Sequence, residues 1–257
     1  MKYYKSIILI IVIGLAAQGC SDPSYPNPQV SSVTRYAKVL FVNASPDAQS
    51  LVYQVNNAQV VTLNPQVVSG YLNVNPGSEQ IRIKNAVFGV VGSDTLALKA
   101  DLVTQSTLTG SASYTVFVVD SVNRPFTKGS GFTSKPGGLT FIGPLSDNLA
   151  IQASKSGIRF YNLAPGSPTV YLSNAGASLG SISNSTAYRA GSSSFSSVAP
   201  NTYTLQVTSG SISGTLLAST TVTLSPGKAY SVFLTGKIVN PGAIVKVAYA
   251  LNVIQHN

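Results

Sequence analysis

The sequence of 257 residues predicts an all-β protein with two tandem β-sandwich domains behind an N-terminal leader. Three observations predict this architecture. Apolar and polar residues alternate with a period of two, short Pro-Gly turns separate the alternating stretches, and one pattern of motifs occurs twice. Alternation with a period of two places one face of each strand in a core. Because no stretch after the leader has useful helical periodicity, both domains are expected to consist of strands.

The first 19 residues have the three parts of a secretory signal peptide. Lys2 and Lys5 make a positive start, an apolar stretch follows from Ile7 to Ala17, and a small residue precedes Cys20. A membrane-spanning helix needs about 20 apolar residues. The apolar stretch is too short for that, so the segment is interpreted as a signal peptide.

Cys20 is the only cysteine of the chain and stands where the apolar run stops. The stretch "LAAQGC" that ends at Cys20 resembles the lipobox of bacterial lipoproteins, although Ala17 and Gln18 depart from the usual residues there. The resemblance implies a lipidated Cys20 that holds the protein at a membrane, with residues 20–34 as anchor and linker. The alternative is an ordinary secretory signal beside a chance cysteine. A cysteine used for lipids is lost to disulfides, metals and nucleophilic chemistry.

The repeated pattern begins with "AKVLFVNASPDAQSLVYQVNN" at Ala37 and returns with "SGIRFYNLAPGSPTVYLSNAG" at Ser156. Offsets between matched motifs run from 116 to 124, and such drift falls in loops when two copies of one fold diverge. We therefore expect a first repeat at 35–148, a linker at 149–155 and a second repeat at 156–257. The matched pairs are Phe41 with Phe160, Asn43 with Asn162, Pro46 with Pro165, Tyr53 with Tyr171 (one residue out of step), Val74 with Val198, and Pro76 with Pro200.

Each repeat holds about seven short predicted strands in about 110 residues, which are the proportions of an immunoglobulin-like β-sandwich. Tyr114 and Tyr230 stand at the start of late strands, each six residues after a leucine. They are candidates for the tyrosine corner of such a fold. The alternative is that they are ordinary strand tyrosines on half-buried faces.

The order of these motifs resembles the domain of unknown function 4397 family, found in secreted and surface lipoproteins of bacteria. The resemblance rests on "NASPDA" and "NLAPGS" after a strand, a following Val-Tyr strand, and the later "YTVFV" and "YSVFL" strands. It covers nearly all of residues 35–257. It implies an extracytoplasmic immunoglobulin-like fold and brings no established activity or catalytic residues. Asp47 of the first copy has no counterpart in the second, so the copies cannot share a role for that carboxylate.

The residue types argue against an enzyme. The only histidine, His256, is next to last, where termini usually fray, so Ser-His-Asp or Cys-His chemistry has no evident base. Seven carboxylates are spread along the chain, and Asp47 and Asp147 stand in turn contexts that favour capping and surface solvation. Neither a zinc nor a calcium ligand pattern occurs. We therefore expect no catalytic residue, no metal and no cofactor.

Charge suggests the kind of partner. Of the 16 Lys and Arg residues, Lys2 and Lys5 lie in the leader, which leaves 14 against 7 Asp and Glu and a net charge of +7. The basic residues are spread thinly, which disfavours nucleic acid, whereas an anionic glycan or an envelope protein is a reasonable partner. Sugar-binding platforms are often flat aromatics, and the chain has no tryptophan.

A long link, Asp120 to Gly138, is the candidate binding loop, because loops beyond about 12 to 15 residues are usually functional or disordered. The equivalent link of the second copy is expected to be short, about Gly236 to Gly242. A self-packed or mobile loop is the alternative. The basic and aromatic residues that would make contact, as hot spots favour, are Arg124, Phe126, Lys128, Phe132 and Lys135.

Thr95 and Ser121 stand in short Asp-Ser/Thr-aliphatic triplets that resemble O-glycan acceptors of some envelope bacteria, although such triplets also occur by chance. Taken together, the sequence predicts a noncatalytic lipoprotein of the outer membrane or cell surface that acts as a structural, adhesive or protein-interaction module. The alternative is a glycan-binding accessory subunit of a polysaccharide uptake system.

Overall fold

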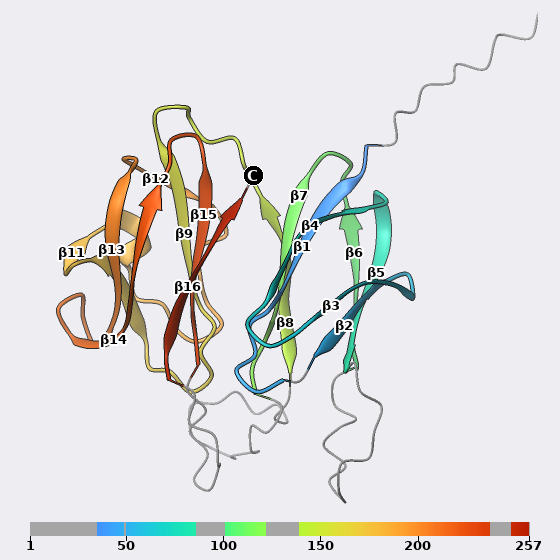
Figure 1. Cartoon of the computed structure of the whole chain (residues 1–257), viewed down its shortest axis with the longest axis horizontal. Coiled ribbons are helices and arrows are strands. Elements are labelled where there is room, and N and C mark those ends of the chain that lie inside the picture. Colours follow the sequence, from blue (N-terminus) through green and yellow to red (C-terminus); the bar gives the residue numbers. More distant parts are fainter. Residues whose placement is uncertain (1–34, 49, 86–100, 122–138, 237–247, 257) are drawn as a thin grey trace, which may run out of the picture. The chain divides into compact units, whose positions relative to one another are not determined.

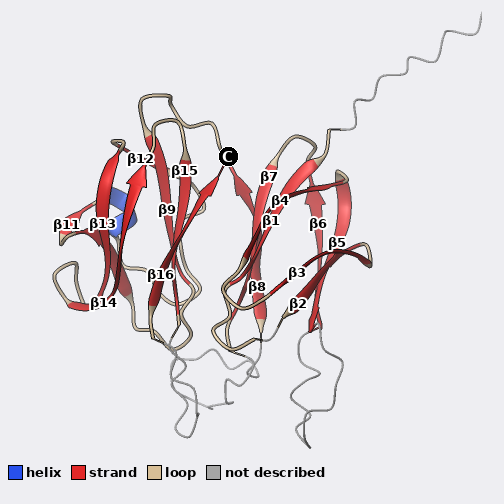
Figure 2. Ribbon diagram, in the orientation of Figure 1, coloured by secondary structure: helices blue, strands red, loops and turns tan. Residues whose placement is uncertain are grey.

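The computed structural model describes residues 35–48, 50–85, 101–121, 139–236 and 248–256, all within one compact unit, Thr34–Asn257. Sixteen strands make up almost all of the regular structure of the described residues, together with a short 3₁₀ turn, η2 (Gly180–Ser183). The all-β prediction is confirmed (Figures 1 and 2). Among the described residues, no helix is long and apolar enough to cross a membrane.

The first repeat contains eight strands in two four-stranded sheets, with orders β4-β1-β7-β8 and β3-β2-β5-β6. Neighbours run antiparallel except β1 and β7, which pair in parallel. The strands are β1 (Ala37–Asn43), β2 (Leu51–Val55), β3 (Ala58–Leu63), β4 (Val68–Val74), β5 (Gly77–Asn85), β6 (Asp101–Leu108), β7 (Ser113–Val119) and β8 (Thr140–Asp147).

The second repeat has the same topology, with sheets β12-β9-β15-β16 and β11-β10-β13-β14 and a parallel pair of β9 with β15. Each strand therefore has a counterpart eight strands earlier. The strands are β9 (Ser156–Asn162), β10 (Val170–Asn174), β11 (Ala177–Ser178), β12 (Ser196–Val198), β13 (Asn201–Ser209), β14 (Thr215–Leu224), β15 (Ala229–Thr235) and β16 (Ala250–His256).

Each repeat is thus a sandwich of two sheets, as the immunoglobulin-like prediction requires, with eight strands where about seven were expected. Constant-type immunoglobulin domains place strands A, B, E and D in one sheet and C, F and G in the other. The present repeats place the first, fourth, seventh and eighth strands together. The likeness therefore lies in the sandwich architecture, and the strand order is a different one.

One apolar core fills each sandwich. The first core gathers residues such as Phe41, Tyr53 and Ile83, and the second gathers Phe160, Leu172 and Val207. Side chains from both sheets of a repeat contribute to its core. This explains why apolar and polar residues alternate along many of the strands, because only one face of such a strand meets the core.

Register corrects one of the pairings drawn from the sequence. Tyr53 lies opposite Ile83, whereas the position opposite Val207 in the second repeat is Leu172. Leu172 is buried in the core, and Tyr171 is only half-buried. A shift of one residue moves a side chain to the other face of a sheet. Tyr53 and Tyr171 therefore are not equivalent, and the structural counterpart of Tyr53 is Leu172.

Two of the repeated polar residues fasten turns. The Tyr114 hydroxyl accepts a hydrogen bond from the Thr109 backbone N–H, and the Tyr230 hydroxyl accepts one from Ser225, each at 2.9 Å. Both hydroxyls thus bond backbone five residues upstream, as a tyrosine corner does. This bonding favours the tyrosine-corner interpretation over that of an ordinary strand tyrosine.

The links between the last two strands of each repeat lie largely outside the described residues. β7 ends at Val119 and β8 begins at Thr140, close to the predicted position. In the second repeat β15 ends at Thr235 and β16 begins at Ala250, and residues 237–247, with most of the expected segment Gly236 to Gly242, lie outside the described residues.

Candidate functional site

A third apolar cluster lies between the two repeats. It joins the outer face of sheet β4-β1-β7-β8 to the outer face of sheet β12-β9-β15-β16. Phe117 is at its centre, with ring centroids 5.4 Å from Tyr161 and 5.5 Å from Phe233. The other buried members are Leu40, Val42, Ala44, Val119, Leu163 and Ile254.

The sequence carried a signal for this second buried face. Every residue of β9 and of β15 is buried, as are the last five residues of β7. Strands covered on both faces read as continuous apolar runs and not as alternation. The runs "VFVV" in β7 and "VFL" in β15 have this character. The requirement for close packing is visible at Gly191, where an added Cβ would lie 2.1 Å from the Tyr161 ring.

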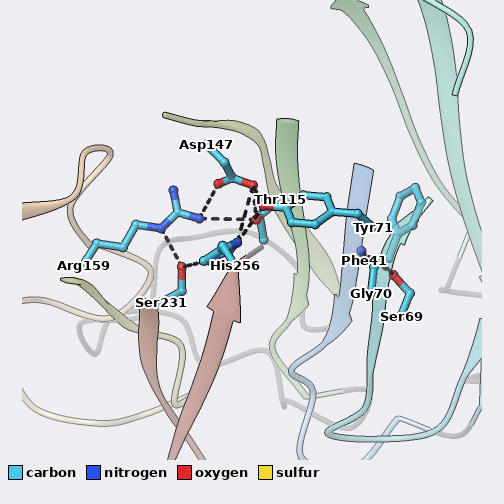
Figure 3. A network of polar contacts seen from close by, with 9 residues as sticks. All are labelled: Phe41, Ser69, Gly70, Tyr71, Thr115, Asp147, Arg159, Ser231 and His256. Carbon is cyan, nitrogen blue, oxygen red and sulfur yellow. Dashed lines mark hydrogen bonds and ion pairs between the residues drawn. The ribbon is translucent and has the colours of Figure 1, made fainter. Parts of the chain in front are cut away.

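Polar side chains gather at one part of this interface and form the candidate site (Figure 3). Arg159 on β9 donates from Nη2 to Oδ1 of Asp147 on β8 at 2.5 Å, and both side chains are fully buried. Tyr71 on β4 donates to Asp147 Oδ2 at 2.7 Å, and so does Thr115 on β7. The carboxylate of Asp147 thus receives three side-chain hydrogen bonds from two repeats.

His256 and Ser231 complete the site from the second repeat. Ser231 on β15 lies 2.7 Å from Nε2 of His256, and its hydroxyl also accepts a hydrogen bond from Arg159 Nε at 2.7 Å. His256 Nδ1 lies 2.6 Å from the Tyr71 hydroxyl and 4.0 Å from Asp147 Oδ2. Asp147, Arg159, Ser231, His256 and Tyr71 therefore form a closed circle of contacts, which we call the polar ring.

A neutral His256 gives the polar ring a consistent direction of donors. Arg159 donates to Asp147 and to Ser231, Ser231 donates to Nε2 of His256, Nδ1–H of His256 donates to Tyr71, and Tyr71 donates to Asp147. Burial is the main reason that the pKa of His256 is lowered from 6.5 to about 4. The negative charge of Asp147 opposes this shift, and the positive charge of Arg159 adds to it. A protonated Nε2 would instead compete with Arg159 for the oxygen of Ser231.

The same environment acts on the tyrosine of the ring. Burial raises the pKa of Tyr71, and the negative charge of Asp147 and its hydrogen bond raise it further. Tyr71 therefore keeps its proton and remains a donor to Asp147. Burial likewise raises the pKa of Tyr161, whose ring centroid lies 5.4 Å from the guanidinium carbon of Arg159.

Aromatic side chains cover the guanidinium group. The carbon of the Arg159 guanidinium lies 4.4 Å from the centroid of the Phe195 ring, within the range of a cation–π interaction. Phe195 also meets His256 edge-on, with centroids 5.4 Å apart. One guanidinium nitrogen, Nη1, has no hydrogen-bond partner among the described residues. The charge of Arg159 is therefore balanced by Asp147 and shielded by rings.

The ring occupies equivalent positions in the two repeats. Asp147 pairs with Ser113 across its sheet, and His256 pairs with Ala229 at the same point of the second repeat. Thr115 corresponds in the same way to Ser231. Leu40 lies opposite Tyr71, and Arg159 lies next to the pair of Ile158 with Ser196, so Arg159 corresponds to Leu40 and Phe195 to Tyr71.

Two contacts join a position to its own counterpart: Asp147 with His256, and Phe117 with Phe233. An interface in which equivalent positions meet has the arrangement of a two-fold symmetric dimer. Here the two halves belong to one chain and carry different residues. The interface that holds the polar ring is therefore approximately two-fold in the positions that meet, and asymmetric in the residues at those positions.

The ring contains the residue types of a catalytic triad without its arrangement. In a triad the carboxylate bonds directly to the histidine that activates the serine. Here the Tyr71 hydroxyl stands between His256 and Asp147, and the Ser231 oxygen is also bonded by Arg159. The side chains of Asp147, Arg159 and His256 are fully buried. This geometry joins side chains of the two repeats across their junction.

Similarity to a known family follows the same two repeats. The sequence profile described as "Domain of unknown function (DUF4397)" matches residues 37–173 and 156–250. The chain belongs to the DUF4397 family. The two matched segments overlap at 156–173, which contains β9 and most of β10. The resemblance expected from the sequence is thus confirmed, with a double match in one DUF4397 chain.

Comparison with other proteins adds little to the family. No curated protein sequence matches this DUF4397 chain. A proposed cell adhesion protein from Bacteroides fragilis NCTC 9343 shares 10% identity, with 86% of this chain and 98% of that chain covered and a TM-score of 0.18. A second, from Bacteroides eggerthii DSM 20697, shares 9% identity over 86% of this chain and 96% of that chain, with a TM-score of 0.17. Scores this low support no argument about function.

Most residues singled out from the sequence lie outside the described residues. Ser121 is the exception: it is buried, and its hydroxyl donates to Asp47 Oδ2 at 2.6 Å. A glycan on Ser121 would have to replace that hydrogen bond. The residues that fall outside are Cys20, Thr95, Arg124, Phe126, Lys128, Phe132 and Lys135.

Two expectations about single residues were wrong. His256 was expected to fray with the C-terminus, yet it is buried at the end of β16 and bonded by two hydroxyl groups. Asp147 was expected to cap a turn in solvent, yet it is the buried counter-charge of Arg159. The only local clue was a positive residue, Arg159, within the apolar run "GIRFY". In the described part of the chain, no three His, Cys, Asp or Glu side chains gather as metal ligands do.

Proposed function

We propose that this DUF4397 protein is a noncatalytic lipoprotein of the bacterial cell envelope whose two repeats act together as an adhesive or protein-interaction module. The observation that carries the proposal is the burial of His256 with Asp147 and Arg159 at the junction of the repeats. The only histidine of the chain is thereby used as structure. A junction sealed by both apolar packing and a polar ring suits a protein that presents surface loops and strand edges from a fixed support.

The leader supports the location. A signal peptide that ends in a lipobox-like "LAAQGC" would place the mature chain outside the cytoplasm, held by acyl chains on Cys20. Each buried CH₂ group of an acyl chain contributes about 0.8 kcal/mol to membrane binding, and two or more chains give stable attachment. The 14 residues that follow Cys20 before the first described residue would then act as a spacer.

Fractionation of cells tests the location. Cys20→Ser should move the protein from the membrane fraction to the soluble envelope, or stop its processing, whereas the neighbouring substitution Ser21→Ala should change neither. Membrane attachment of Cys20→Ser equal to that of the parent would refute lipid anchoring at this residue. Protease treatment of intact cells then separates an external location from a periplasmic one, because only an external chain is degraded.

A binding assay tests the role. The favoured proposal predicts retention of the mature protein by envelope proteins and no selective binding on an array of acidic and neutral glycans. Selective and saturable binding to one polysaccharide class would refute it in favour of the glycan-binding accessory subunit. Turnover of any ester, amide or glycoside substrate that Ser231→Ala abolishes would refute the noncatalytic assignment.

A further inference from the structure

The edges of the four sheets are not protected equally. Unpaired edge strands are templates for pairing with another chain, and proteins blunt them by shortness, charge, proline or bulges. In the second repeat β11 has two residues and β12 has three. In the first repeat the edge strand β8 contains Pro144 at an irregularity in its pairing with β7. These edges offer few consecutive groups for a further strand.

β14 lacks each of these forms of protection. It is ten residues long, it lies at the end of its sheet with β13 as its only hydrogen-bonded neighbour among the described strands, and its sequence "TLLASTTVTL" has no charge, proline or glycine. β16 of the other sheet approaches it across the core without pairing with it. Its one irregularity falls near its start, between the pairs of Val207 with Ala218 and of Thr208 with Leu216. From Ala218 to Leu224 the strand is regular. Leu216 at its beginning is 53% exposed.

The sheet behind β14 is also uncharged. None of the residues in β10, β11, β13 and β14 is charged, in a chain whose formal net charge is +9. The outward face carries amide and hydroxyl groups in cross-strand pairs: Gln206 with Ser219, Thr204 with Thr221, and Thr202 with Thr223, whose hydroxyls are 2.9 Å apart. Two copies of a positive chain can therefore approach along this sheet with the least repulsion.

We propose that β14 is the self-association edge of the protein, where a second copy of the chain adds its own β14 in antiparallel register and joins two four-stranded sheets into one. A second copy of β14 is the partner because the strand is compatible with itself. In a two-fold antiparallel pair each residue faces a residue of the identical strand, so any charged side chain near the axis would meet its own like charge. β14 has no such side chain, and a like-charge pair directly opposite is destabilising.

The regular stretch determines the register. With Thr221 on the two-fold axis, all seven residues from Ala218 to Leu224 pair. Ala218 then faces Leu224, and Thr220 faces Val222, on the core side. Ser219 faces Thr223, and the two Thr221 side chains face each other, on the outer side. Every core-side residue meets a core-side residue, as the period of two requires, and the outer row of hydroxyl groups continues across the junction.

A cysteine on the axis tests this register. In a Cys20→Ser background the introduced thiol is the only one in the chain. Thr221→Cys places two thiols on directly opposed residues, whose Cα atoms would be about 4.5 to 5.5 Å apart, within reach of a disulfide. The matched control is Thr204→Cys. Thr204 is exposed, as Thr221 is, and lies opposite Thr221 on β13, on the same face of the sheet. It is one strand further from the proposed two-fold axis.

Mild oxidation of the purified full chain should give a disulfide-linked dimer for Thr221→Cys, several-fold more abundant than for Thr204→Cys. The two Thr204 positions of the proposed dimer would be about 14 Å apart, three strand spacings, too far for a disulfide. Equal cross-linking of both variants, or none of either, would overturn the proposal. Both variants must first show the thermal unfolding of the Cys20→Ser parent.

Sedimentation velocity gives an independent measurement. Thr221→Lys would place two ammonium groups against each other on the axis and should lower the fraction of dimer several-fold, more so at low salt. Thr204→Lys adds the same charge to the same face and should leave the dimer fraction near that of the parent. A parent that is monomeric at all concentrations, or a Thr204→Lys variant that dissociates as fully as Thr221→Lys, would overturn the proposal. Because β14 alone carries this inference, it holds whether or not Cys20 is lipidated.

Discussion

Acid should loosen the junction of the two repeats through His256. The unfolded chain binds a proton at this residue with a pKa near 6.5, whereas burial and the neighbouring Arg159 lower the pKa in the folded protein to about 4. Well above pH 6.5, His256 is neutral in both the folded and the unfolded state, and the free energy of unfolding is not reduced by its protonation. As the pH falls from 6.5 towards 4, the unfolded state takes up a proton that the folded state resists, so the free energy of unfolding decreases. Below 4 both states are protonated and the loss levels off.

The magnitude follows from the two pKa values. A difference of one pKa unit corresponds to about 1.4 kcal/mol, so the largest loss through His256 is about 3 kcal/mol. At pH 5 about 2 kcal/mol of this is lost, because the folded form is still mostly neutral there. A loss of this size is a large share of the stability of a typical domain, which is about 5 to 15 kcal/mol.

Denaturant unfolding at several pH values provides the assay. The free energy of unfolding is measured between pH 7.5 and 5 for the parent and for His256→Gln, which keeps an amide donor and acceptor but does not titrate. His256 is the only histidine, so subtraction of the two curves removes the contribution of the carboxylates. The difference should shrink by about 2 kcal/mol between pH 7.5 and 5. Parallel curves for parent and variant would refute the assignment of a neutral, buried His256.

Three further predictions concern single contacts. Asp147→Asn leaves the Arg159 guanidinium buried without a counter-charge and should cost about 3 to 5 kcal/mol in denaturant unfolding; adding Arg159→Met should recover most of the loss, and no recovery would contradict this account. Tyr230→Phe removes the acceptor of a backbone N–H and should lower the unfolding free energy by about 1 kcal/mol; an unchanged midpoint would show that the tyrosine corner is not stabilising. Arg124→Ala with Lys128→Ala should weaken attachment to an anionic envelope component in a salt-sensitive manner without changing thermal unfolding; equal attachment at low salt would leave the loop as a connection only.

The features that could be predicted from the sequence are those that depend on residues close together along the chain. Alternation along a strand reports that one of its faces is buried, and Pro-Gly turns report where it ends, so the strands and their duplication could be located. The edge strand β11, with two residues, leaves too short a pattern to detect in the second repeat. The slip at Tyr53 arose because an apolar tyrosine fits either face of a half-buried strand, and only pairing with Ile83 determines which.

The junction between the repeats could not be derived in this way. Its polar ring joins residues as far apart as Tyr71 and His256, 185 positions along the chain, and nothing in either local context indicates the other. A terminal histidine and a turn-like aspartate have ordinary solvent-exposed interpretations. Arg159 alone conflicts with its surroundings, because a guanidinium in a fully buried strand requires a partner. That conflict predicts a buried acidic residue, although it does not identify Asp147.

The asymmetry of the polar ring decides which halves can recognise each other. Two first repeats placed face to face would oppose Asp147 with Asp147, and two second repeats would bring Arg159 and His256 against the same pair with no carboxylate between them. Only the unlike combination balances charge at these equivalent positions. Selectivity of this kind comes from penalties on the wrong partner. The junction therefore favours the pairing of a first repeat with a second repeat over the pairing of two like repeats. If repeats were exchanged between two chains, the same charge balance would again require one first and one second repeat at each junction.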